Sequence, residues 1–403
     1  MVIGELKYRF LFTPIKINSI NLENRVVMAP THDGLASWDG FVTPEMMDFY
    51  LRRARGGVSM IIVGAVAVNP RKAPILLRIS DDKFIPGISE FVTKVHTETG
   101  VKVFAQLIDM LKMARGWMQD VNDVPSEEVK DIVNYFVNGA IRAQKAGFDA
   151  IELHAAHGYT LSAFLSLRNK RDDGYGKTSD GRMRIVEEIY NRLHATLGPQ
   201  YPLGIRINGD EFIVGGNTLQ QSRIIARKLT AMGFDYISVS AGGKNEDSPG
   251  FHPKAGSPWP YPPVGGYSGT RAMPPAEMPE AVNVYLAADI RRAIRQAGYS
   301  APVITAGRIP YPDLAESILR EGQADIIALS RPLLRDPDWV VKAKNGREKE
   351  IKRCTYPKST TNVAGTPILG GGNVFLGTPW PVTGAVTCAS RGLAPCSKLG
   401  PDN

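Results

Sequence analysis

Short runs of consecutive apolar residues alternate with longer amphipathic segments along most of the chain. Eight of these runs are rich in Val, Ile or Leu at successive positions, which is typical of strands buried on both faces of a parallel sheet. The predicted strands are Arg25–Pro30, Val58–Val68, Val101–Leu107, Phe148–Ala156, Pro202–Gly209, Phe234–Gly242, Pro302–Gly307 and Asp325–Ser330.

Helical segments separate these runs and carry start and stop signals. The first opens with Thr-Pro-Glu, a cap followed by proline at the first helical position, and ends in Gly-Gly. The predicted helices are Pro44–Gly57, Pro125–Gly147, Asp180–Leu197, Thr218–Met232, Pro275–Ala297, Pro312–Glu321 and Asp336–Asn345. Eight strand–helix repeats indicate an α/β fold of the closed (β/α)₈ TIM-barrel type. A doubly wound open sheet is the alternative, but it seldom needs eight such regular units.

Three stretches fall outside the repeat. Residues 1–24 precede the first strand and are predicted to form an N-terminal hairpin that closes the barrel floor. Residues 241–275 hold eight prolines and seven glycines, too long a connection for a simple loop, and are predicted to be a lid. Residues 354–403 form a Gly/Thr/Pro-rich C-terminal tail, interpreted as an extended wrap around a barrel of residues 1–353.

Composition narrows the class of protein. The 403 residues are 43% hydrophobic and 22% charged, as in ordinary globular proteins. The three cysteines, Cys354, Cys388 and Cys396, indicate a reducing compartment, and we expect a cytoplasmic protein. No signal peptide or membrane-spanning run is expected. The net charge of +8 suits an anionic ligand, but the basic residues are scattered, so nucleic acid is not expected as a partner.

Active sites of TIM barrels lie at the C-terminal ends of the strands, where this chain carries Gly and polar residues. Gly307-Arg308 and Ser330-Arg331 end the last two strands, where barrels often bind phosphate; the alternative is that they are ordinary loop residues. Lys244 is the only lysine near a strand end, which disfavours a Schiff-base aldolase. The carboxylates there are unpaired, which disfavours a two-carboxylate glycosidase.

An ordered set of motifs runs from about residue 9 to residue 350. The motifs are Asn24-Arg25-Val-Val-Met-Ala29-Pro30, Gln106, Glu152-Leu-His154-Ala-Ala-His157-Gly-Tyr159, Phe164-Leu-Ser166, Asn169-Lys-Arg171-x-x-x-Tyr175-Gly176, Arg182-x-Arg184, Arg206-Ile-Asn208-Gly, Gly307-Arg308-Ile and Ser330-Arg331-Pro-Leu-Leu-x-Asp336-Pro. This set resembles the Old Yellow Enzyme family of FMN-dependent ene-reductases, and the Pro30-Thr31-His32 stretch is similar to the barrel domain of 2,4-dienoyl-CoA reductases.

The resemblance implies FMN as cofactor and assigns residues to it. Gln106 and Arg206 would bind the pyrimidine edge of the flavin, and the guanidinium would stabilise negative charge on the reduced ring. The remaining cofactor residues would be Ala29, Pro30, Thr31 and Ala65 against the ring and Gly307, Arg308, Ser330 and Arg331 around the phosphate.

The resemblance also implies that His154 and His157 bind a substrate carbonyl oxygen and that Tyr159 donates a proton to Cα. His32, beside the flavin, and His252, in the predicted lid, are further substrate-binding candidates. Alternatives remain for each. The His-x-x-His pair could ligate a metal, but no third ligand is evident, and we expect no metal. Tyr159 could be a rim aromatic, and His32 could only pack.

The chain departs from the family pattern at two places. After Gln106 the family usually shows Leu-x-His-x-Gly-Arg, whereas this chain has Leu-Ile-Asp109-Met-Leu-Lys112. Of the cysteine cluster typical of dienoyl-CoA reductases, only Cys354 is kept, so an iron–sulfur cluster is not expected. Direct reduction of FMN by NADH or NADPH is the simplest interpretation, with an electron-donor protein as the alternative.

We therefore expect an NAD(P)H:flavin-dependent ene-reductase that acts on a small α,β-unsaturated carbonyl, including CoA thioesters. One alternative is an FMN-dependent amine dehydrogenase or demethylase on the same scaffold. Others are a phosphate-binding barrel isomerase or lyase without flavin, and a non-catalytic barrel whose tail recruits a partner. Assembly into a homo-oligomer stays open.

Overall fold

Eight parallel strands close into a barrel, so the predicted TIM-barrel fold is confirmed. This computed structural model describes residues 7–71, 75–114, 117–243, 246, 269 and 271–356. Each barrel strand lies inside a predicted run, except that β5 extends one residue past its run. The strands are β3 (Val26–Met28), β4 (Met60–Ala67), β5 (Lys102–Ile108), β8 (Ala150–Ala155), β9 (Leu203–Asn208), β10 (Tyr236–Ser240), β11 (Val303–Thr305) and β12 (Ile326–Leu329). The last strand pairs with the first, with Leu329 opposite Met28.

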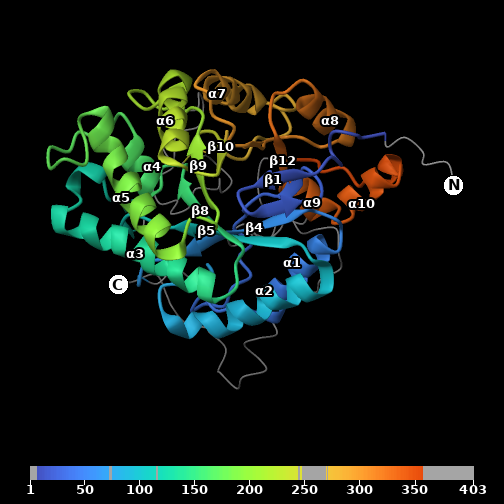
Figure 1. Cartoon of the computed structure of the whole chain (residues 1–403), viewed down its shortest axis with the longest axis horizontal. Helices are drawn as coiled ribbons and strands as arrows, with labels where there is room; N and C mark the ends of the chain where they lie inside the picture. The colour runs from blue at the N-terminus through green and yellow to red at the C-terminus, as the bar shows by residue number, and fades with distance from the viewer. Residues whose placement is uncertain are drawn as a thin grey trace, which may run out of the picture.

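Helices surround the strands on the outside of the barrel (Figure 1). They are α1 (Pro44–Ala54), α2 (Ile85–Thr99), α3 (Ser126–Lys145), α4 (Thr160–Leu165), α5 (Ser179–Leu197), α6 (Leu219–Met232), α7 (Val284–Gln296), α8 (Pro312–Arg320), α9 (Arg331–Arg335) and α10 (Trp339–Lys344). Local signals explain several starts: Thr43 caps α1 by accepting the Met46 N–H at 3.2 Å. Within the described ranges, no helix has the length and apolar character needed to cross a membrane.

Side chains of opposite faces of each strand enter two different cores. Val27, Met60 and Phe104 belong to the cluster that fills the barrel interior, while Val26 and Met28 pack outward in the main core. Gly204 leaves room inside for Tyr236, because a Cβ at Gly204 would lie 2.0 Å from that ring. Burial on both faces explains why the strands read as continuous apolar runs.

The predicted N-terminal hairpin is present as two short antiparallel strands, β1 (Ile15–Ile17) and β2 (Ile20–Leu22). Ile17, Ile20 and Leu22 join the same apolar cluster as the barrel-interior residues. The hairpin thus closes the end of the barrel opposite the strand C-termini. A second small hairpin, β6 (Met113–Ala114) with β7 (Trp117–Met118), follows β5.

The helix predicted to begin at Pro275 is wrong at its start, because α7 begins at Val284. The preceding segment is instead held by tertiary bonds: Arg308 donates to the Pro275 carbonyl at 2.6 Å, and the Ala281 N–H donates to the Arg308 carbonyl at 2.8 Å. Helices α2, α4 and α9 were not predicted. Most of the predicted lid, including His252, and the tail from residue 357 lie outside the described residues.

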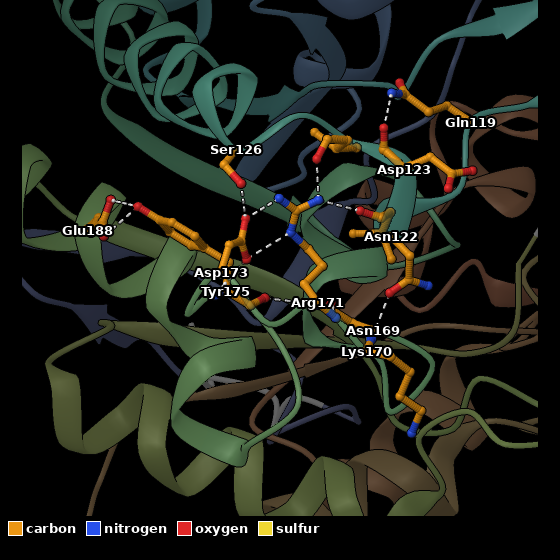
Figure 2. A network of polar contacts seen from close by, with 12 residues as sticks. Gln119, Asn122, Asp123, Ser126, Asn169, Lys170, Arg171, Asp173, Tyr175 and Glu188 are labelled. Atoms are coloured by element: carbon orange, nitrogen blue, oxygen red, sulfur yellow. Dashed lines mark hydrogen bonds and ion pairs between the residues drawn. The ribbon is translucent and has the colours of Figure 1, made fainter.

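The Asn169–Gly176 motif forms a buried polar network between α4 and α5 (Figure 2). The Arg171 guanidinium donates to the carbonyls of Val121 and Val124 and forms an ion pair with Asp173. Asp173 also accepts the Ser126 hydroxyl at 2.7 Å. Arg171 thereby ties the segment before α3 to the loop that follows α4. Arg171 is therefore part of the motif because it holds these two segments together, and not because it contacts a ligand-binding cleft.

Replacing Arg171 by Met should lower the free energy of unfolding by about 2–4 kcal/mol, because two buried carbonyls and a carboxylate lose their donor. Burial alone would raise the pKa of Asp173, but hydrogen bonds from Arg171 and Ser126 outweigh burial and lower that pKa to about 2. A carboxyl with a depressed pKa stabilises the fold above its unfolded value, so this contribution is lost as the pH falls from about 4 towards 2. Urea unfolding at pH 7 and pH 3 measures both effects.

The matched control is Arg347→Ala, since Arg347 and its partner Glu350 are about half exposed. That change should cost less than 1 kcal/mol. An equal loss in both variants would contradict the role of the Arg171 network.

Candidate active site

Two adjoining clefts lie over the C-terminal ends of the strands and share Pro30, His32, His157, Tyr159 and Arg206. The larger cleft encloses about 1100 Å³ of empty space, its open mouth included. Every predicted site residue that the structure describes lines one of them. The larger cleft adds Ala29, Thr31, Gly307, Arg308, Ser330 and Arg331, and the smaller adds Ala65, Gln106 and His154. His252 lies outside the described residues.

One end of the larger cleft is formed by the turns after β11 and β12. Gly307 and Arg308 both have positive φ, 117° and 51°, and a Cβ at Gly307 would lie 2.9 Å from Asn283 Nδ2. Glycine is therefore required at Gly307 both by conformation and by space. The Ser330 hydroxyl lies 2.7 Å from that of Thr31, which joins the turn after β12 to the turn after β3.

Two arginine side chains converge at this end without a carboxylate partner. Neither Arg308 nor Arg331 forms an ion pair within the part of the chain that the structure describes, and Arg308 Nε is buried there without a hydrogen-bond partner. Arg331 is 9% exposed, and burial lowers its pKa. Buried cations require an anion, so this end fits a phosphate group.

Tyr356 completes this end and was missed by sequence reasoning. Its ring lies 4.8 Å from the Arg308 guanidinium and 4.6 Å from that of Arg331, and it lines the cleft. The residue follows Cys354 at the start of the predicted tail, with no regular element to place it. The lining of the cleft therefore extends beyond Cys354, into the stretch interpreted from the sequence as a tail.

The middle of the clefts brings together β4, β5 and β9. Gly64 allows a close approach, since a Cβ there would lie 2.4 Å from Pro30 Cβ and 3.1 Å from Gln106 Oε1. The Gln106 amide N–H donates to the fully buried Glu152 at 2.6 Å, which leaves its carbonyl oxygen on the Gly64 side. Arg206 donates to the hydroxyls of two serines of β10, Ser238 and Ser240.

This arrangement presents one acceptor, from Gln106, and several donors, from Arg206. The pyrimidine edge of a flavin offers the complementary N–H and carbonyl groups. Together with the phosphate end, the residues present fit FMN.

Three rings form a cluster where the clefts meet. His154 lies near the end of β8, His157 follows in the turn with φ of 64°, and Tyr159 precedes α4. The ring centre of His154 lies 5.1 Å from that of His157 and 5.0 Å from that of Tyr159. The sequence spacing therefore brings all three predicted residues together.

His157 is held by neighbouring strands. Its Nε2 lies 2.6 Å from the Ser240 hydroxyl, and its backbone N–H donates to Asn208 Oδ1 at 3.3 Å. Gly243 pairs with it, and a Cβ at Gly243 would lie 2.5 Å from His157 Cα. Burial, together with the Arg206 charge, lowers the pKa of His157 to about 3, so the imidazole is neutral at physiological pH.

The described residues contain no group of three or more His, Cys, Asp or Glu positioned to hold a metal ion. Burial also lowers the pKa of His32, which lines both clefts. Ser240 and Asn208, which fix His157, were not assigned a role from the sequence. Both occupy strand ends, which is the signal that could have identified them.

The fold and the cleft define a TIM barrel with a flavin-type site at its C-terminal rim. The chain belongs to the NADH:flavin oxidoreductase / NADH oxidase family, which it matches over residues 10–123, 118–242 and 276–350. The resemblance to the Old Yellow Enzyme family is confirmed, as are FMN and NAD(P)H as the cofactor and reductant of that family.

Three curated relatives illustrate the range of this family. The chain is 36% identical over 366 residues to the NADH oxidase of Thermoanaerobacter brockii, covering 85% of this chain and 52% of that protein. It is 33% identical to the NADPH dehydrogenase of Halalkalibacterium halodurans, and the match covers 82% of this chain and 92% of that protein. It is 27% identical to the cinnamate reductase of Clostridium sporogenes, and the match covers 86% of this chain and 54% of that protein.

A solved 2-naphthoyl-CoA reductase has the same fold, with a TM-score of 0.74 and 23% identity over 87% of this chain and 54% of that one. The chain thus spans about half the length of several proteins that it matches, including the NADH oxidase.

Arg308→Ala and Arg331→Ala should each purify with little FMN. Each loses a charge-assisted bond to phosphate worth about 1.5–3 kcal/mol, which corresponds to a loss of about 10- to 150-fold in affinity. Flavin absorbance per protein after dialysis measures the effect. Arg353→Ala is the control, because Arg353 is exposed and stacks on Tyr311 outside the cleft. Full flavin occupancy in both test variants would refute the phosphate site.

Proposed function

We propose that this protein is an FMN-dependent NAD(P)H oxidoreductase that reduces the C=C bond of an α,β-unsaturated carbonyl compound. The observation that carries the proposal is the cluster of His154, His157 and Tyr159 beside a cleft that fits FMN. The cluster combines a neutral imidazole, His157, that can donate a hydrogen bond to an oxygen with a phenol that can protonate a carbanion.

The cofactor would lie along both clefts. Arg308 and Arg331, with the turns at Gly307 and Ser330, would hold the phosphate. The ring would lie against Ala29, Pro30, Thr31 and Ala65, with Gln106 and Arg206 at its pyrimidine edge. FMN, when bound, supplies hydride transfer from NAD(P)H to the substrate.

His157 is suited to bind the carbonyl oxygen. When the Ser240 hydroxyl accepts from Arg206 at 3.2 Å and donates to His157 Nε2 at 2.6 Å, the imidazole proton lies on Nδ1. A neutral imidazole with a fixed tautomer donates a hydrogen bond without contributing an isolated charge. With His154 beside it, the pair would stabilise the enolate oxygen that forms when hydride reaches Cβ.

Tyr159 would supply the proton that Cα then needs. Phenols are weak acids, but the carbon to be protonated is strongly basic at that moment. Tyr159 is 7% exposed and belongs to a buried apolar cluster with Leu76 and Ile108, so it has little freedom to leave the cleft.

The substrate class is an enone, an enoate or an enoyl-CoA or aromatic acyl-CoA thioester. The relation to a cinnamate reductase supports a conjugated carboxylate or its thioester, since cinnamate carries a C=C bond beside a carboxyl group. His32, which lines both clefts, is a further candidate for contact with the substrate.

Tyr159→Phe should bind 2-cyclohexen-1-one normally and accept hydride from NADPH or NADH at the wild-type rate. Reoxidation of the reduced flavin by the enone should slow by about 10²–10⁴-fold, the usual contribution of general-acid catalysis. Anaerobic stopped-flow measurement separates the two half-reactions. Tyr299→Phe, a change of a surface tyrosine, is the control.

His157→Ala should instead raise KM and weaken binding of phenols, which mimic an enolate.

Equal slowing of both half-reactions in Tyr159→Phe, or no slowing of reoxidation, would remove Tyr159 from the chemistry. Anaerobic bleaching of the flavin by an amine and not by NAD(P)H would favour the dehydrogenase alternative.

A further inference from the structure

Asp109 lies directly after β5, at the place where the chain departs from the pattern Leu-x-His-x-Gly-Arg, and it is 1% exposed. Its Oδ2 accepts the Thr160 hydroxyl at 2.5 Å, and its backbone carbonyl accepts the Thr160 N–H at 3.3 Å. Its Oδ1 accepts the Asn69 amide at 2.5 Å and Arg71 at 3.2 Å. Asp109 thus connects three separate segments at the rim of the barrel.

Thr160 is the residue directly after Tyr159, and it is fully buried at the start of α4. The Tyr159 N–H donates to the Ala156 carbonyl at 3.3 Å, and its carbonyl accepts the Ala163 N–H at 2.8 Å. The backbone on both sides of Tyr159 is therefore fixed, by the turn on one side and by Asp109 through Thr160 on the other. This backbone sets the direction of the Tyr159 Cα–Cβ bond, from which the side chain extends to line the cleft.

A buried carboxylate is expensive unless every acceptor is used. Burial raises the pKa of Asp109, while bonds from Thr160 and Asn69 and the charge of Arg71 act against that rise. Hydrogen bonds to an ionised acceptor are shorter and stronger than those between neutral groups. An aspartate that is ionised at this point holds Thr160 more firmly than a neutral side chain could.

We propose that Asp109 is a positioning residue for the candidate proton donor: through Thr160 it fixes the orientation of the Tyr159 phenol in the cleft. The chemical consequence rests on the proposed function, whereas the orientation itself does not.

The orientation can be tested by ¹⁹F NMR of the flavin-loaded protein labelled with 3-fluorotyrosine. The Tyr159 resonance is assigned by its loss in Tyr159→Phe. Asp109→Asn and Thr160→Val should shift or broaden that resonance, whereas Thr160→Ser, which keeps the hydroxyl, should leave it unchanged. Thr97→Val, at an exposed threonine bonded only within α2, is the matched control. An unchanged Tyr159 resonance in both test variants would overturn the proposal.

The chemical consequence is tested by the two half-reactions. Asp109→Asn and Thr160→Val should slow reoxidation by 2-cyclohexen-1-one about 10- to 100-fold, as expected for a misplaced catalytic group, without changing reduction by NADPH. In a Tyr159→Phe background the same changes should cause no further slowing. Undiminished slowing in that background would show that Asp109 acts by another route and overturn the proposal.

The two proposals can fail separately. If Tyr159→Phe leaves reoxidation at the wild-type rate, the proton-donor role fails, and the ¹⁹F resonance still decides whether Asp109 orients the ring. If Tyr159→Phe is slow but Asp109→Asn and Thr160→Val are not, the proposed function stands and the positioning role fails.

Discussion

Closure of the barrel is the constraint on which the site depends. Residues at the two ends of the fold meet only because β12 pairs with β3, which places the Ser330 hydroxyl 2.7 Å from that of Thr31, 299 positions earlier. Parallel strands also place all their C-terminal ends on one rim. An open sheet would separate Arg308 and Arg331 from the turn at Ala29 and Pro30, and the cleft would not exist.

The sequence predicts the barrel well because its signals are local. Each strand is buried on both faces, so a continuous apolar run marks it without knowledge of its neighbours. The start of α7 was predicted wrongly because a tertiary contact, and not a local signal, determines it. Pro275 offers a helix-start signal, but its carbonyl accepts from Arg308, and the chain continues along the turn after β11 until Val284. A bond between distant residues overrides the local preference, and no pattern within the segment reveals it.

The same distinction separates the predicted site residues from the missed ones. Gly307, Arg308 and the histidine pair stand at strand ends, where position in the repeat is enough to suggest a role. Tyr356 enters the cleft only because the chain after α10 returns to the rim, where its carbonyl accepts the Ala276 N–H at 2.9 Å. In the sequence, Asp109 is visible only as a departure from a family pattern. The structure shows that the aspartate accepts hydrogen bonds from Thr160 and Asn69, which lie in two other segments.

Charge is divided along the clefts in a way that suits both binding and reduction. The guanidinium groups of Arg206, Arg308 and Arg331 supply fixed positive charge, while His157 beside Arg206 is kept neutral. A second cation at His157 would have to be buried next to the first, which burial and repulsion both disfavour. In the proposed function, the neutral imidazole would contribute a hydrogen bond to the substrate oxygen and leave stabilisation of charge on the cofactor to the arginines. This division would allow the substrate carbonyl to bind beside an anionic cofactor without competing for the same cations.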